Sequence, residues 1–193
     1  YNTQDLTLPV ITNNQGADPF WRRTAGALYD VDFADAGGSA LSKFQVKAST
    51  NPGGAGPDLS PYVDVAVDIL ANSYTADWAL PAAVFNAMLD GTTNWVTVRV
   101  LDGGGNEAVL GGAFSVMKDT SPPSFAVAQA GDAQRRAVGG TLYDADARDG
   151  ASGLERLQYS VSTAPFTADQ AVLGWTDVPL GGATTWLSAD WAV

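Results

Sequence analysis

One eight-residue pattern occurs twice in this chain. Leu-Tyr-Asp-Val-Asp-Phe-Ala-Asp occupies residues 28–35, and Leu-Tyr-Asp-Ala-Asp-Ala-Arg-Asp occupies residues 142–149. The likeness extends to both sides at an offset of 113 or 114 residues: Pro9 matches Pro123, Gln45 matches Gln158, Asp64 matches Asp177 and Trp78 matches Trp191. A period of this length, with its small change of offset confined to loops, indicates one domain-sized unit used twice.

The likeness also predicts the domain boundaries. Lys-Asp-Thr-Ser-Pro-Pro (118–123) aligns with Gln-Asp-Leu-Thr-Leu-Pro (4–9), so a linker separates the two copies. The predicted parts are a linker or tail of a preceding repeat (1–8), a first repeat (9–119) and a second repeat (120–193). Nothing in the second copy matches residues 81–119, so we expect it to be C-terminally incomplete. The sheet edge left open would be filled by neighbouring repeats of the same chain or by another chain through strand addition.

Within a repeat the apolar residues follow the period of β-strands. Three segments alternate apolar and polar side chains: 41–49, 63–69 and 95–101. In the first of them Phe44, Val46 and Ala48 share one face, and Gln45 and its polar neighbours share the other. This alternation is typical of antiparallel strands with one face in water.

A single segment, residues 81–89, has the pattern of a helix. Pro81 suits a first helical position, and the apolar stripe that follows ends at Leu89. About seven short strands separated by turn residues then account for a repeat. The sequence thus predicts an all-β chain of tandem immunoglobulin-like Greek-key β-sandwiches, with a short helix before the last two strands.

Two segments resemble a known family. Arg-Val-Leu-Asp-Gly-Gly-Gly-Asn-Glu-Ala (99–108) is similar to the Asp-x-Ala-Gly-Asn turn near the end of many bacterial Ig-like repeats, with Gly104 in place of the Ala. The segment 118–123 resembles the linkers between such repeats. The resemblance implies a non-enzymatic structural segment of a long extracellular or cell-surface bacterial protein, such as a stalk, adhesin shaft or filament wall. It implies no catalytic residues.

Composition excludes several classes of function. The chain has neither Cys nor His, which removes thiol nucleophiles, Cys-based zinc sites and imidazole bases. Its formal net charge of -11 repels phosphate backbones, so we expect no nucleic-acid partner. No apolar run is long enough to span a membrane. No carboxylate pair stands out by spacing or setting, so the sequence predicts no enzyme.

The repeated acidic motif allows two interpretations. If residues 28–33 form a strand, its apolar residues point inward and Asp30 and Asp32 point outward, with Asp35 in the following loop. These carboxylates either lie in water and cap turns, or bind Ca²⁺, which prefers oxygen ligands. The candidate calcium ligands are Asp30, Asp32 and Asp35 in the first copy and Asp144, Asp146 and Asp149 in the second. No other cofactor is expected.

The six Trp residues provide the alternative function. Trp78 and Trp191 occupy matching positions, which favours a place in the core. The others, Trp21, Trp95, Trp175 and Trp186, are candidates for an exposed platform that stacks on sugar rings. The alternative is therefore a carbohydrate-binding or adhesive module, alone or as accessory to a secreted enzyme.

Overall fold

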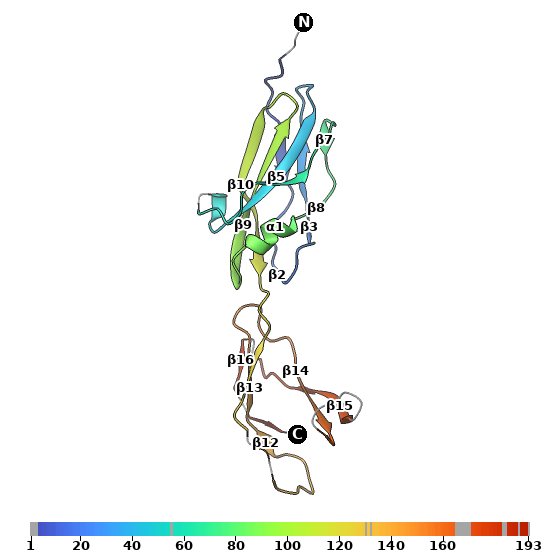
Figure 1. Ribbon diagram of the computed structural model, residues 1–193, viewed down its shortest axis with the longest axis vertical. Helices are drawn as coiled ribbons and strands as arrows, with labels where there is room; N and C mark the ends of the chain where they lie inside the picture. The colour runs from blue at the N-terminus through green and yellow to red at the C-terminus, as the bar shows by residue number, and fades with distance from the viewer. Residues whose placement is uncertain are drawn as a thin grey trace. The chain divides into compact units, whose positions relative to one another are not determined.

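The chain forms two compact units, Tyr1–Thr120 and Ser121–Val193. The computed structural model describes residues 4–54, 56–129, 131, 133–164, 171–182, 185–188 and 190–192. In this described part the helical elements are α1 (Ala82–Ala87) and the 3-10 turn η1 (Pro52–Gly54). The remaining elements are strands (Figure 1), which confirms the predicted all-β class. Residues 1–3 of the predicted leading segment lie outside the described residues.

The first unit contains two main sheets. Its strands are β1 (Val10–Asn13), β2 (Trp21–Arg22), β3 (Leu28–Tyr29), β4 (Val31–Ala34), β5 (Leu41–Ser49), β6 (Val63–Ala66), β7 (Ser73–Tyr74), β8 (Trp78–Ala79), β9 (Thr92–Asp102) and β10 (Glu107–Lys118). One sheet has the order β2-β10-β9-β5-β6, and the other has the order β1-β4-β7. A separate pair joins β3 to β8.

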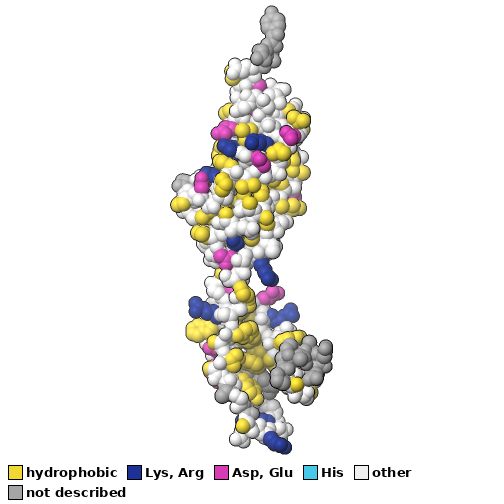
Figure 2. Space-filling model, viewed as in Figure 1, with side chains coloured by type: hydrophobic (Ala, Val, Ile, Leu, Met, Phe, Trp, Pro, Cys, Tyr) yellow, Lys and Arg dark blue, Asp and Glu magenta, His cyan; other side chains and the backbone are white. Residues whose placement is uncertain are grey.

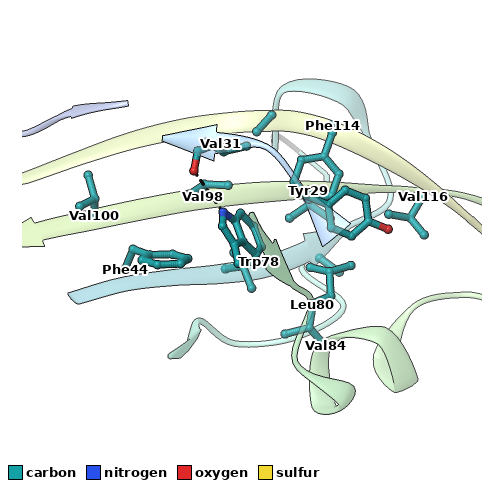
Figure 3. Packing of buried hydrophobic residues seen from close by; sticks show 14 of the residues in the cluster. Tyr29, Val31, Phe44, Trp78, Leu80, Val84, Val98, Val100, Phe114 and Val116 are labelled. Atoms are coloured by element: carbon teal, nitrogen blue, oxygen red, sulfur yellow. Dashed lines mark hydrogen bonds between the residues drawn. The ribbon is translucent and has the colours of Figure 1, made fainter. Parts of the chain in front are cut away.

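A single apolar cluster fills the space between these sheets (Figure 3). Phe44 and Val46 of β5 are fully buried, as the alternation predicts, and so are the alternate Val residues of β9. The Phe33 ring of β4 stacks on Phe44 at 4.4 Å between centroids, so the two sheets meet directly. Burial of each such side chain contributes about 1.5–3 kcal/mol, which makes this cluster the main source of the unit's stability.

The outer face of β5 differs from the predicted wet face. Gln45 is only 7% exposed although it points away from the core. The Arg99 guanidinium of β9 donates to its Oε1 and lies over the Tyr62 ring, 4.0 Å from the centroid. Figure 2 shows acidic and basic side chains next to one another on one face of this unit. Cross-strand contacts therefore cover Gln45, which the sequence of β5 alone does not indicate.

The strand predicted at 63–69 is shorter in the structure. β6 ends at Ala66, and Val67 is 54% exposed. Asp68 and Leu70 both have left-handed backbone angles, with φ of 52° and 51°. Since a residue in that region cannot continue a regular strand, the β6 ladder ends here. The chain nevertheless stays beside β5, because the amides of Ile69 and Leu70 donate to the carbonyls of Ser42 and Leu41.

The predicted helix forms but is also shorter than residues 81–89. Pro81 precedes α1 as its N-cap, and Met88 already has an extended backbone with ψ of 147°. Leu89 is consequently 47% exposed, which corrects its predicted place on the apolar stripe. The Lys118 Nζ donates to the carbonyl of Met88 at 2.9 Å, so a β10 side chain satisfies the last turn of the helix.

The second unit is smaller. Its strands are β11 (Ser124–Val127), β12 (Leu142–Tyr143), β13 (Ala145–Arg148), β14 (Leu157–Ser162), β15 (Ala171–Val178), β16 (Trp186–Leu187) and β17 (Trp191–Ala192). They pair as β11-β13-β16, β12-β17 and β14-β15. Among the described residues of this unit, the buried apolar ones are Ala147, Leu157, Val178 and Leu187. On the side drawn in Figure 2, a band of hydrophobic side chains is visible on this unit.

Strand pairing in the second unit follows that of the first at the sequence offset. β11 pairs with β13 as β1 pairs with β4: Ser124 lies opposite Arg148, and Val10 lies opposite Ala34. The same shift relates β12-β17 to β3-β8, and β13-β16 to β4-β7. The two sequence copies thus adopt the same local register.

Matching side-chain hydrogen bonds accompany these registers. The Trp78 indole Nε1 donates to the carbonyl of Val31 at 3.1 Å, and Trp191 donates to that of Ala145 at 3.2 Å. Trp78 is 3% exposed inside the apolar cluster, which places it in the core as predicted. Trp191 is half-buried against the smaller cluster of the second unit.

Candidate metal centre

The predicted ligands Asp30 and Asp32 share one partner. The Asn14 side-chain amide donates to Asp30 Oδ1 at 3.1 Å and to Asp32 Oδ2 at 3.0 Å. Both acids point away from the core, on the face opposite the buried Tyr29 and Val31. A neutral amide thus bridges these two carboxylates.

Asp35 lies in a different environment. It follows β4 and is 4% exposed. Its Oδ1 accepts the Gly37 amide at 2.9 Å, which closes a tight turn, and its amide donates to the carbonyl of Asn72. Its second oxygen, Oδ2, is buried without a hydrogen-bond partner. A buried carboxylate oxygen without a partner destabilises a fold, so this atom is a candidate cation ligand.

Two acids that the sequence analysis did not select lie beside it. Carboxylate oxygens of Asp5, Asp35 and Asp102 all lie within 4.8 Å of one another. Asp102 is the last residue of β9 and is 3% exposed, whereas Asp5 is half-buried in the segment before β1. The structure therefore groups Asp35 with these two acids rather than with Asp30 and Asp32.

Short hydrogen bonds orient Asp5 and Asp102. The Asn106 amide nitrogen Nδ2 donates to Asp102 Oδ2 at 2.7 Å and to the backbone carbonyl of Asp5 at 3.1 Å. The backbone amides of Ser39 and Thr7 donate to the Asp5 carboxylate, both at 3.0 Å. Hydrogen bonds from Ser39 and then Thr7 hold the pKa of Asp5 below its usual value. Asp5 is thus ionised at neutral pH and its side chain is held in place.

Glycines allow the three segments to approach. A Cβ at Gly37 would overlap the Asp5 carboxylate, and one at Gly104 would lie within 3.2–3.3 Å of Asp5, Asp102 and Asn106. The glycine-rich turn after β9 therefore serves close packing around the carboxylates. This turn includes the position where the resembled family has Ala.

The chemistry of this centre suits a hard cation. Within the described part of the chain, no Lys or Arg forms an ion pair with any of the three acids. Three carboxylates this close repel one another in a buried setting, and a divalent cation with oxygen ligands reverses the sign of that interaction. The three side chains would hold Ca²⁺ or Mg²⁺, with backbone carbonyls or water completing the ligand set.

The second trio of predicted ligands is arranged differently from this centre. Asp149 is 7% exposed, and its Oδ1 accepts the amides of Ala151 at 3.0 Å and Gly153 at 3.1 Å. Asp144 and Asp146 are half-buried. Among the residues with described side chains, no group of three acids forms around them. Calcium at Asp144, Asp146 and Asp149 thus remains a prediction.

A second cluster of polar side chains in the first unit surrounds Asp18. Arg22 Nε donates to Asp18 Oδ2 at 2.8 Å, and the Tyr29 hydroxyl donates to the same oxygen at 3.3 Å. Burial raises the pKa of Asp18, but hydrogen bonds from Arg22 and from the Phe20 amide outweigh it, so the net pKa is lowered. Burial, followed by the Asp18 charge, raises the pKa of Tyr29. These bonds satisfy buried polar atoms, which gives the group a role in stability.

The four remaining Trp side chains lie in unequal environments. Trp175 and Trp186 in the second unit are 63% and 60% exposed. Trp21 and Trp95 in the first unit are half-buried. The exposed pair thus belongs to the second copy alone, at positions where the first copy has Tyr62 and Ser73.

The sequence does contain signals for Asp5 and Asp102, the two ligands that were not predicted. Asp102 opens the glycine-rich turn that carries the family resemblance, and Asp5 aligns with Asp119 of the linker. Asp102 thus lies in one of the two segments that resemble the family, and Asp5 aligns with the other. The acidic motif predicts ligands that are close together in sequence. The centre instead combines carboxylates from three segments that are distant in sequence.

No helix of the described residues is long and apolar enough to cross a membrane. Comparison with known proteins adds no family: no protein-family model, curated protein or solved structure matches this chain.

Proposed function

We propose that this chain is a non-enzymatic structural segment of a long extracellular bacterial protein. In this proposal each unit is an immunoglobulin-like Greek-key sandwich, and such units follow one another as tandem repeats. The segment serves as a stalk, adhesin shaft or filament wall at the cell surface. Its partners are the neighbouring repeats.

One observation carries this proposal. The strand registers and the indole-to-carbonyl bonds of the first unit recur in the second at the offset of the sequence repeat. Reuse of one domain-sized unit along a chain is typical of repeat proteins, which form extended arrays. The two facing sheets and their non-consecutive strand order further support a Greek-key sandwich.

Surface exposure tests this role. Antibodies raised against the 193-residue chain should label intact cells of the source bacterium as strongly as permeabilised ones. An antibody against a cytoplasmic protein, which labels only permeabilised cells, provides the control. Labelling of permeabilised cells alone would reject the extracellular assignment.

The proposal includes a structural Ca²⁺ at Asp5, Asp35 and Asp102. The partnerless Asp35 Oδ2 and the two neighbouring carboxylates support it. Because Asp5 belongs to the segment before β1, a cation there would tie that segment to the loops after β4 and β9. A bound ion would thus restrict the motion of the segment before β1 relative to the first unit, which suits a role as a shaft.

Calorimetric titration of the chelator-treated chain with CaCl₂ tests this site. At 0.15 M NaCl, which screens the diffuse attraction of an acidic chain, we expect saturable binding. Asp102→Asn should abolish it, because it removes a carboxylate while keeping the shape. Asp30→Asn is the matched control and should bind like the parent chain. Loss of binding in Asp30→Asn with retention in Asp102→Asn would instead favour the sequence-predicted trio, and binding by neither protein would reject a calcium centre.

The exposed Trp175 and Trp186 favour a second candidate, a carbohydrate-binding or adhesive module. Aromatic rings in water are suited to stacking on sugars. The structural role is preferred because the two copies differ at these positions. Binding to a glycan array that is lost in both Trp175→Ala and Trp186→Ala would reverse this preference.

A further inference from the structure

Among the described strands, β14 of the second unit has a neighbour on one side only. It pairs with β15, and no other described strand joins that sheet. Its counterpart β5 pairs with β6 on one side and with β9 on the other. No described strand takes the place of β9 beside β14, so one edge of β14 has no strand partner among the described residues.

The inner face beside this edge is incompletely covered. In the first unit Phe44, Val46 and Ala48 lie opposite alternate Val residues of β9, and all of them are fully buried. The counterparts of these β5 residues are Leu157, Tyr159 and Val161. Leu157 is buried, Tyr159 is half-buried and Val161 is 38% exposed. The exposed end of β14 is thus the end that corresponds to Ala48, which faces Val96 in the first unit.

The outer face indicates which polar side chain an added strand would need. In the first unit Gln45 Nε2 donates to Asp64 at 2.7 Å, and Gln45 Oε1 accepts from Arg99 of β9. In the second unit Gln158 Nε2 donates to Asp177 in the same way, at 2.8 Å.

With its amide nitrogen engaged by the carboxylate, Gln158 presents its carbonyl oxygen as an acceptor. A cationic donor opposite this oxygen would reproduce the charge-assisted bond of the first unit.

We infer that the open edge of β14 binds one extended segment, antiparallel to it, of the pattern Val-x-Val-Arg-Val. The alternate Val side chains cover Tyr159 and Val161, and the Arg between them donates to Gln158 Oε1. Backbone hydrogen bonds along β14 supply affinity, and the inward apolar and outward cationic side chains supply specificity. This inference is independent of the calcium centre.

A peptide of residues 92–102, Thr-Thr-Asn-Trp-Val-Thr-Val-Arg-Val-Leu-Asp, is the probe. We expect saturable binding to the intact 193-residue chain by fluorescence anisotropy, with slowed amide exchange across 157–162. A peptide with Val98→Pro should not bind, because proline removes a backbone donor from the strand. A peptide with Arg99→Glu should bind about 10-fold more weakly or worse, since it replaces a charge-assisted bond by repulsion.

Variants of the chain locate the binding edge. Val161→Lys changes an exposed residue of β14 and should abolish peptide binding. Val127→Lys is the matched control, because it makes the same change at a 68% exposed position of β11, and it should bind normally.

Three results would overturn the inference. They are equal binding of the proline peptide, protection outside 157–162, and protection of β14 that rises with protein concentration without peptide. The last would identify a second copy of the chain as the occupant.

Discussion

The indole of Trp78 provides the sharpest test of how the first unit is stabilised. Trp78→Phe keeps an aromatic ring in the cluster but removes the donor to the Val31 carbonyl (Figure 3). Leaving a buried carbonyl without this donor costs about 1–3 kcal/mol. The lost ring atoms add a fraction of the roughly 3–5 kcal/mol that complete truncation of such a side chain costs. We therefore expect a loss of roughly 2–4 kcal/mol in the free energy of unfolding of the first unit.

The chain contains its own control for this experiment. Trp191→Phe removes the equivalent bond to Ala145 at a half-buried position, where water can replace the donor. Its cost should stay near or below about 1 kcal/mol. Hydrogen exchange read separately on peptides from β9 and β14 assigns each loss to its unit. Equal losses in the two variants, or a loss below about 1 kcal/mol for Trp78→Phe, would refute the argument that burial sets the value of this bond.

Three further variants test other buried polar groups. Because the folded-state pKa of Asp18 is lowered, its ion pair with Arg22 stabilises the fold above the unfolded-state pKa of about 4 and is lost as pH falls. Asp18→Asn should thus flatten the acid side of a plot of urea midpoint against pH, and an unchanged slope would contradict this role. Asn94 is fully buried and exchanges two hydrogen bonds with the backbone of Leu89, so Asn94→Ala should cost about 2–4 kcal/mol in urea unfolding, against near zero if water takes its place. Lys118→Met should lower the melting temperature by removing the donor at the end of α1, at a cost of about 1–3 kcal/mol, and a gain in stability would show that burying the ammonium outweighs its bonds.

The alternation of apolar residues predicted the core-facing positions well. In β5 and β9 every predicted inward side chain is buried, because a two-residue period leaves each side chain only one of two faces. The ends of elements were less predictable. β6 ends before Val67 because Asp68 has a left-handed backbone, and α1 ends before Leu89. Both limits depend on backbone angles that no residue pattern at those positions specifies.

The candidate metal centre was only partly predictable. Asp35 was selected, but its neighbours Asp5 and Asp102 come from segments 30 and 67 residues away in sequence. A local motif reports on side chains of one strand, and alternate residues of a strand point together. The centre instead forms where a strand end, a turn and the segment before β1 meet, which requires knowledge of sheet order.

One pairing in the first unit has a mechanical consequence. β2 near the start of the unit runs parallel to β10 at its end, with Trp21 opposite Met117 and Arg22 opposite Lys118; every other strand pair of the described residues is antiparallel. Once β1 has separated from β4, tension on the chain pulls β2 and β10 in opposite directions along their length. The hydrogen bonds of this pair are then loaded together in shear rather than broken one after another. We therefore expect this short pair to resist mechanical unfolding of the five-stranded sheet to which it belongs.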